Sequence, residues 1–127
     1  MENLFIEGTT TTPKIDFNAQ SGTLIIYGRS IPEHPINFYK PIESWLTEYL
    51  QTNPQKISLE IHLDYLNTHS TECLFILLKK IETFKIETSN NVSVIWHYDE
   101  DDEDLFDMGE NFAEMIKIPF KFNPINQ

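Results

Sequence analysis

The chain has 127 residues, of which 40% are hydrophobic and 13% aromatic, and its formal net charge is -11 at pH 7. A chain of this length buries about 68% of its unfolded surface, and its hydrophobic content exceeds that of a disordered chain. Nine Lys and Arg residues against 20 acids leave no basic stripe, which excludes nucleic acid and anionic lipid as expected partners. We therefore expect a single folded, acidic domain over residues 1–127.

The sequence also indicates where the protein resides. Its single cysteine, Cys73, has no partner within the chain for a disulfide, and residues 1–14 have neither a basic segment nor a long apolar segment typical of a secretory signal. The apolar run at 73–78 is far too short to cross a bilayer. We expect a cytoplasmic protein that does not enter the membrane.

The first third of the chain predicts three strands. Residues 3–8, 14–18 and 23–28 are rich in β-branched and aromatic side chains, and the polar segment 18–22 between the last two is typical of a hairpin turn. The prolines in 30–35 then break the strand pattern.

A first helix is predicted over residues 37–53. Its apolar residues recur at helical spacing: Phe38, Ile42, Trp45, Leu46, Tyr49 and Leu50. Asn53 and Pro54 supply a stop signal. A start at Asn37 would place Pro41 slightly too deep for the first turn and bend the helix there.

A strand over 56–66 and a helix over 70–85 follow. The strand alternates, with one face formed by Ile57, Leu59, Ile61, Leu63 and Tyr65 and the other by Ser58, Glu60, His62 and Asp64. The helix has an apolar stripe of Leu74, Leu77, Leu78, Ile81 and Phe84. Cys73 lies beside this stripe, where a small hydrophobic core residue is the simpler explanation than a nucleophile.

The last third predicts a strand at 92–98, an acid-led helix within 99–117 and a strand at 119–123 that closes the sheet. The inward residues expected on this helix are Leu105, Met108, Phe112, Met115 and Ile116. The order β-β-β-α-β-α-β-α-β predicts a two-layer α/β fold, in which about three helices cover one face of a mixed sheet.

No motif of an enzyme or a metal site is recognisable. The acidic run 99–104 has Asp104 where a calcium loop of the EF-hand type needs glycine, so we interpret it as a solvated helix start, with partner recognition as the alternative. The histidines are scattered, and no phosphate-binding glycine loop or nucleophile elbow is present. We expect no catalytic activity, no cofactor and no metal.

The joint at 67–71 is richer in polar side chains than a helix start requires. Asn67 or Thr68 would suffice to cap the helix, and capping alone accounts for such residues at most helix starts. A phosphate at this position would meet free backbone N–H groups and the positive end of the helix dipole. The joint is therefore suited to phosphorylation without unfolding.

Four segments resemble the SiaC family of bacterial regulatory phosphoproteins, whose fold is similar to the anti-sigma-factor-antagonist (STAS-like) domains. The joint "YLNTHS" follows a regular strand as in that family. The other segments are the N-terminal "IEGTTTTPKIDFN", the turn and first helix "IPEHPINFYKPIESWLTEYL" and the acid-rich "VIWHYDEDDEDLFDMGENFAEM". Together they cover nearly the whole chain.

The resemblance implies a partner-switching circuit. A cognate protein kinase would phosphorylate Thr68 and a PP2C-type phosphatase would reverse this, while the unphosphorylated form would bind and regulate an effector such as a diguanylate cyclase. Because His69 stands where the family commonly has serine, Ser70 and Thr71 are fallback acceptors. The predicted partner surface comprises Asp64, Asn67, Thr68, His69 and Ser70.

Two other functions are compatible with the residues. The first is a STAS-like protein-binding module that is never phosphorylated. The second is an acid-dependent metal enzyme that would use Asp101, Asp102 and Asp104. A single mass in native cells would indicate the first, and divalent-cation binding that needs these carboxylates would indicate the second.

Overall fold

A computed structural model describes residues 1–126 as six strands and three helices in the predicted order. The elements are β1 (Leu4–Ile6), β2 (Lys14–Phe17), β3 (Thr23–Ser30), α1 (Pro35–Gln51), β4 (Lys56–Leu66), α2 (Thr68–Thr88), β5 (Asn91–Asp99), α3 (Glu103–Met115) and β6 (Phe120–Ile125). The six strands form one sheet in which they lie side by side in chain order. The pairs β1–β2 and β2–β3 are antiparallel, and β3, β4, β5 and β6 are parallel.

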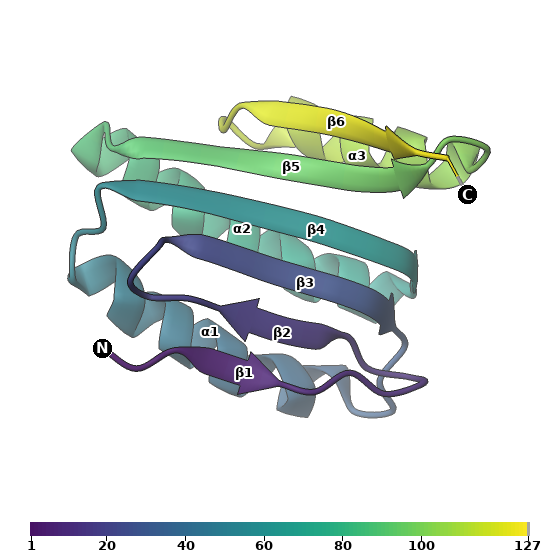
Figure 1. Ribbon diagram of the computed structural model, residues 1–127, viewed down its shortest axis with the longest axis horizontal. Helices are drawn as coiled ribbons and strands as arrows, with labels where there is room; N and C mark the ends of the chain where they lie inside the picture. The colour runs from purple at the N-terminus through teal and green to yellow at the C-terminus, as the bar shows by residue number, and fades with distance from the viewer. Residues whose placement is uncertain (127) are drawn as a thin grey trace.

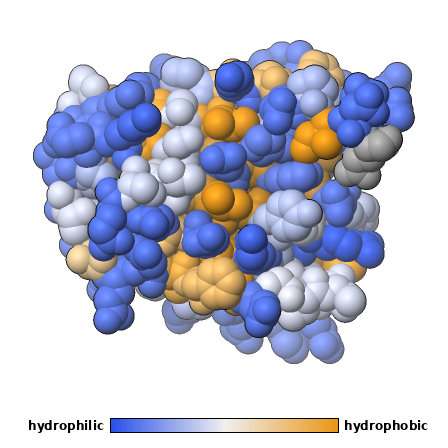
Figure 2. Space-filling model, in the orientation of Figure 1, coloured by the Kyte–Doolittle hydropathy of each residue, from blue (hydrophilic) through white to orange (hydrophobic). Residues whose placement is uncertain are grey.

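All three helices lie on the same side of this sheet (Figure 1). The predicted two-layer α/β fold with a mixed sheet is therefore confirmed. The opposite side of the sheet carries polar residues interspersed with apolar ones (Figure 2). One row across it runs from Lys14 through Tyr27, His62 and His97 to Asn123, which are register partners on five successive strands.

The core lies between the helices and the sheet, and its largest fully buried side chains are Trp96, Tyr49, Phe17 and Phe112. Trp96 fixes α3 on the sheet, because its indole N–H donates to the carbonyl of Leu105 at 3.1 Å. Gly109 allows this close approach, since a Cβ there would lie 2.5 Å from the indole nitrogen. Any larger residue would displace α3 from Trp96.

Helix α1 begins at Pro35, two residues before the predicted start. Proline is well suited to the first helical turn, because the N–H group that it lacks would be unpaired there. Pro41 consequently lies inside the helix, on its exposed side, where the carbonyl left without an N–H partner can bind water.

Two predicted core positions are wrong. Tyr65 is 52% exposed because the register between β3 and β4 moves from Gly28–Leu63 to Arg29–Tyr65, so that Asp64 is an extra residue. Such a bulge reverses the alternation after it, and Leu66 is buried instead. Met115 is 53% exposed. It lies ten residues after the buried Leu105 on α3, and this spacing rotates it about 80° around the helix axis, away from the core.

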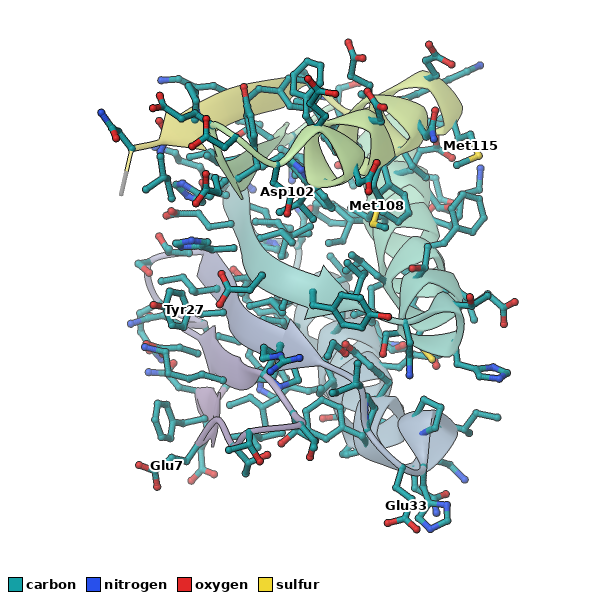
Figure 3. All side chains as sticks on the ribbon, turned by 90° about the vertical axis from the view of Figure 1, so that its right-hand side faces the viewer. Glu7, Tyr27, Glu33, Asp102, Met108 and Met115 are labelled. Carbon is teal, nitrogen blue, oxygen red and sulfur yellow. The ribbon has the colours of Figure 1, made fainter. Side chains whose placement is uncertain are left out.

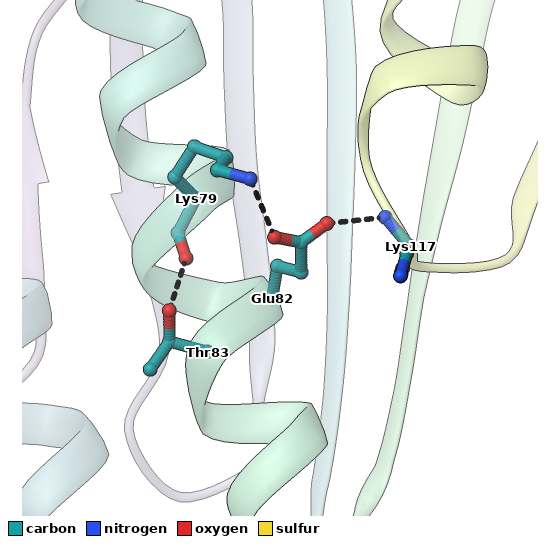
Figure 4. Close-up of polar contacts among 4 residues, drawn as sticks. All are labelled: Lys79, Glu82, Thr83 and Lys117. Atoms are coloured by element: carbon teal, nitrogen blue, oxygen red, sulfur yellow. Dashed lines mark hydrogen bonds and ion pairs between the residues drawn. The ribbon is translucent and has the colours of Figure 1, made fainter.

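A buried carboxylate connects α2 with the segment that follows α3 (Figure 4). Glu82 accepts from the backbone N–H of Lys117 at 2.5 Å and from the ammonium group of Lys79 at 2.7 Å. The hydrogen bond from Lys117, followed by that from Lys79, lowers the pKa of Glu82. The charged carboxylate therefore stabilises the packing of α2 against the segment between α3 and β6.

Candidate functional site

The amino ends of all three helices lie at one end of the molecule. Because β3, β4, β5 and β6 are parallel, their carboxyl ends meet at the right-hand end in Figure 1, and α1, α2 and α3 begin there. Figure 3 faces this end, where Glu33 marks the approach to α1 and Asp102 the start of α3. The carboxyl edge of a parallel sheet is where α/β proteins commonly bind ligands.

The joint between β4 and α2 is a capped helix start. Asn67 has an extended backbone, with φ -85° and ψ 176°, and its side-chain oxygen accepts from the N–H of Ser70 at 2.9 Å. The N–H and the hydroxyl of Thr71 both donate to the carbonyl of Asn67, at 2.9 and 3.0 Å. Asn67 also donates its own N–H to the carbonyl of Ser30 on β3. The capping role expected at this joint is therefore confirmed for Asn67.

Thr68 and His69 occupy the exposed side of the first helical turn. Thr68 is the first residue of α2, and no hydrogen bond within residues 1–126 engages its hydroxyl. The side chain of His69 is 74% exposed, and it lies 4.0 Å from the equally open carboxylate of Glu72. An ion pair as exposed as that of His69 with Glu72 contributes little to stability. The side chains of Thr68 and His69 are therefore free to contact another protein.

Ser70 is buried, so the prediction that it lies on the partner surface and serves as a fallback acceptor is wrong. It has no exposed surface, and its hydroxyl accepts from the hydroxyl of Ser30 at 2.8 Å. Ser30 is bonded in turn to the hydroxyl of Tyr39, and burial raises the pKa of Tyr39 to about 12. Ser70 therefore connects α2 to β3 and α1 inside the protein, and neither a kinase nor a partner reaches it in this conformation.

Asp64 and His69 line different hollows beside the joint. Together with His62 it lines an open cleft of about 710 Å³, opposite the acids Asp99, Asp101, Asp102, Glu103 and Asp104. Asp102 caps α3 by accepting from the N–H of Leu105 at 3.0 Å, which confirms the predicted acid-led helix start. Burial, and then the neighbouring His97, lower the pKa of His62, while Asp64 acts in the opposite direction.

The structure adds residues that the sequence did not indicate. His34 and Ile36, at the start of α1, form a shallow hollow with His69, and Ile36 is 75% exposed. Ser30 and Tyr39 lie beneath the joint. Their position depends on the parallel pairing of β3 with β4, and no local sequence motif predicts it.

The remaining reactive side chains lie away from the joint or are partly buried. Cys73 is half-buried against the core, and burial, followed by the nearby Glu72, raises the pKa of its thiol. Within residues 1–126, no three His, Cys, Asp or Glu side chains are placed to hold a metal ion. None of the helices in the same part of the chain combines the length and apolar character needed to cross a membrane.

The comparisons with known proteins agree with one another. A family model described as SiaC family regulatory phosphoprotein matches residues 6–125. An uncharacterized protein of Pseudomonas aeruginosa (strain UCBPP-PA14) is 32% identical over 120 residues, or 94% of each chain.

Two solved structures of Pseudomonas aeruginosa proteins are similar over nearly their whole length. Apo-SiaC is 31% identical with a TM-score of 0.88, over 97% of this chain and 99% of that one. SiaC in a complex with the diguanylate cyclase SiaD, of which it is the activator, is 31% identical with a TM-score of 0.89, over 96% and 99% of the two chains.

Proposed function

Because this chain belongs to the SiaC family of regulatory phosphoproteins, we propose that it is a binding protein whose partner is selected by phosphorylation of Thr68. A cognate kinase would add the phosphate, and a PP2C-type phosphatase would remove it. The unphosphorylated form would bind and regulate an effector. We propose a diguanylate cyclase, since SiaC of Pseudomonas aeruginosa is the activator of the cyclase SiaD. The chain itself supplies no catalytic group to this cycle, which would operate in the cytoplasm, where a kinase finds ATP.

The observation that carries the proposal is the position of Thr68, exposed on the first turn of a firmly held helix. A kinase must reach both the acceptor hydroxyl and the backbone beside it, and Thr68 and His69 leave this side of the turn open. Asn67 and the buried Ser30 and Ser70 hold the turn from behind. Phosphorylation would then change the surface without a rearrangement of the fold.

The helix start also favours the phosphorylated product. The N–H of Ser70 is already bonded to Asn67, whereas those of Thr68 and His69 belong to the first turn, where no preceding helical carbonyl is present to accept them. These N–H groups and the helix dipole would stabilise a phosphate that carries about -1.5 to -2 charges. The modified protein should therefore fold as stably as the unmodified one.

The size of the required effect supports a position of Thr68 inside the interface rather than at its edge. To change effector occupancy from about 99% to about 1%, phosphorylation must alter relative affinity by roughly 5.5 kcal/mol. A phosphate at a solvated rim is screened too strongly for this, but one that is buried against a partner without a matching cation is not. We propose that Asn67, Thr68 and His69 contact the partner, with Asp64 at the edge of the contact.

Substitution of the acceptor tests the proposal. Thr68→Ala should take up no phosphate from the cognate kinase, as read by intact mass, and should retain effector binding within about threefold. Thr68→Asp should weaken effector binding at least about tenfold, since it places a negative charge in the interface. Stimulation of the cyclase should decrease with binding.

Thr71→Val is the matched control, because it removes a hydroxyl one turn away that is used only to contact the carbonyl of Asn67. This variant should be phosphorylated like the wild type. Full phosphorylation of Thr68→Ala would disprove the assignment of Thr68 as the acceptor. A Thr71→Val variant that takes up no phosphate would transfer the acceptor role to Thr71. A chain that takes up no phosphate at any position would be a binding module without a switch.

A further inference from the structure

A groove separates α2 from α3 beside the joint. It has a volume of about 340 Å³, and its lining residues are Thr71 of α2 and Asp104, Asp107, Met108, Asn111, Phe112 and Met115 of α3. Met115 is 53% exposed, and Met108 is half-buried. Figure 3 shows both methionines on the helix-covered side of the molecule, with Met108 between α3 and α2. The groove is thus apolar at its floor and open to another protein.

The helix that supplies most of this groove belongs to the most acidic stretch of the chain. Residues 99–114 hold nine of the 20 acids of the chain and no Lys or Arg. Two of these acids, Asp104 and Asp107, line the groove itself. An apolar floor with a carboxylate rim is complementary to a helix that has one apolar face and cationic flanks.

We propose that this groove docks a cationic amphipathic helix of a partner protein. Met108 and Met115 are seven residues apart, so they project from one side of α3 about 10.5 Å apart along its axis. Two apolar side chains one heptad apart on the docked helix have the same spacing. Methionine is flexible and polarizable and adapts to such side chains, while Asp104 and Asp107 bind Lys or Arg beside them.

The groove acts separately from the Thr68 switch. Thr71 lines the groove one turn after Thr68, so a phosphate on Thr68 would add negative charge near a site that already attracts cations. Such a charge would not expel a cationic helix. The groove is therefore a constant anchor, and the joint is the contact that phosphorylation changes. The docking of a cationic helix in the groove does not depend on the proposed function. Only the assignment of this helix to the effector rests on the proposed function.

Methionine methyl NMR on the full chain tests this inference. The protein has three methionines, Met1, Met108 and Met115, so ¹³C-methyl labelling gives three signals that substitution assigns. The probe is a synthetic Lys/Leu peptide of about 18 residues, or five helical turns, with one apolar face. A peptide of the same composition in scrambled order has the same charge but no apolar face.

At an ionic strength of about 0.15 M, where weak surface attraction is screened, the amphipathic peptide should shift the Met108 and Met115 signals and leave Met1 unchanged. It should bind about tenfold more tightly than the scrambled peptide, because burial of one apolar side chain has an effect of that size. Equal binding of both peptides, or an equal shift of Met1, would overturn the inference and leave only non-specific charge attraction.

Matched variants locate the site. Met115→Gln combined with Asp107→Asn should weaken peptide binding at least about fivefold. Ile86→Gln combined with Glu87→Gln is the control, because Ile86 is a 62% exposed apolar residue beside an exposed acid on α2. Equal losses in both double variants would refute the groove. Thr68→Asp should bind the peptide like the wild type, and loss of binding there would refute the separate anchor. None of these results depends on whether a kinase modifies Thr68.

Discussion

Glu82 shows how one buried residue stabilises the arrangement of the helices. Its carboxylate accepts from the N–H of Lys117 and from Lys79, and thereby connects α2 with the segment before β6. Glu82→Gln keeps the shape but removes the charge from these bonds. We expect the free energy of unfolding to fall by about 2 kcal/mol, and Tm by roughly 6 °C. Urea and thermal denaturation followed by circular dichroism measure both quantities.

The effect of this substitution should depend on pH. The hydrogen bonds from Lys117 and Lys79 lower the pKa of Glu82 in the folded state below the usual value of 4.5. The carboxylate therefore contributes its full stability above pH 4.5, and this contribution is lost as pH falls through the lower folded pKa. The stability difference between wild type and Glu82→Gln should shrink in this range. Glu87→Gln, an exposed change on the same helix, should not alter the free energy of unfolding. A stability difference between wild type and Glu82→Gln that stays constant down to pH 3 would contradict this account.

At the scale of one element, the amino end of α2 depends on its cap. Asn67→Ala removes the acceptor of the Ser70 N–H and should lower the free energy of unfolding by about 1 kcal/mol. Asn67→Asp retains an acceptor and adds a negative charge at the positive end of the helix, so it should be at least as stable as the wild type. Hydrogen exchange of the first turn should accelerate in the alanine variant alone. Equal stability of the alanine and aspartate variants would show that the cap contributes nothing.

Local patterns predicted the elements better than their long-range contacts. Alternation over 56–66 and the stripe over 70–85 specify a strand and a helix, because each repeat belongs to one kind of secondary structure. The exposure of Tyr65 depends on a bulge in the pairing with β3, which nothing in the strand itself reveals. Burial of Ser70 likewise depends on Ser30, 40 residues earlier. The polar residues of the joint are adjacent in the sequence, whereas the groove depends on the packing of α3 beside the start of α2.

At the scale of the whole molecule, the negative charge is unevenly distributed. On the uncovered side of the sheet, Lys14 and Lys121 share the surface with Asp16 and Glu60. The nine acids of residues 99–114, by contrast, have no Lys or Arg among them, and six of the nine are consecutive at 99–104. Like charges concentrated in this way repel one another most in the folded state, where they are closest.

This distribution predicts that salt stabilises the protein, and that the α3 acids cause most of the effect. The screening length shortens from about 30 Å at 0.01 M to about 3 Å at 1 M, so Tm should rise by about 4 °C over this range. Glu110→Gln combined with Glu114→Gln should raise Tm at low salt and reduce its salt dependence. Glu7→Gln combined with Glu33→Gln removes the same charge from exposed positions away from α3 (Figure 3) and should change both quantities less. Equal effects of the two pairs would mean that net charge, and not its concentration along residues 99–114, sets the electrostatic cost of folding.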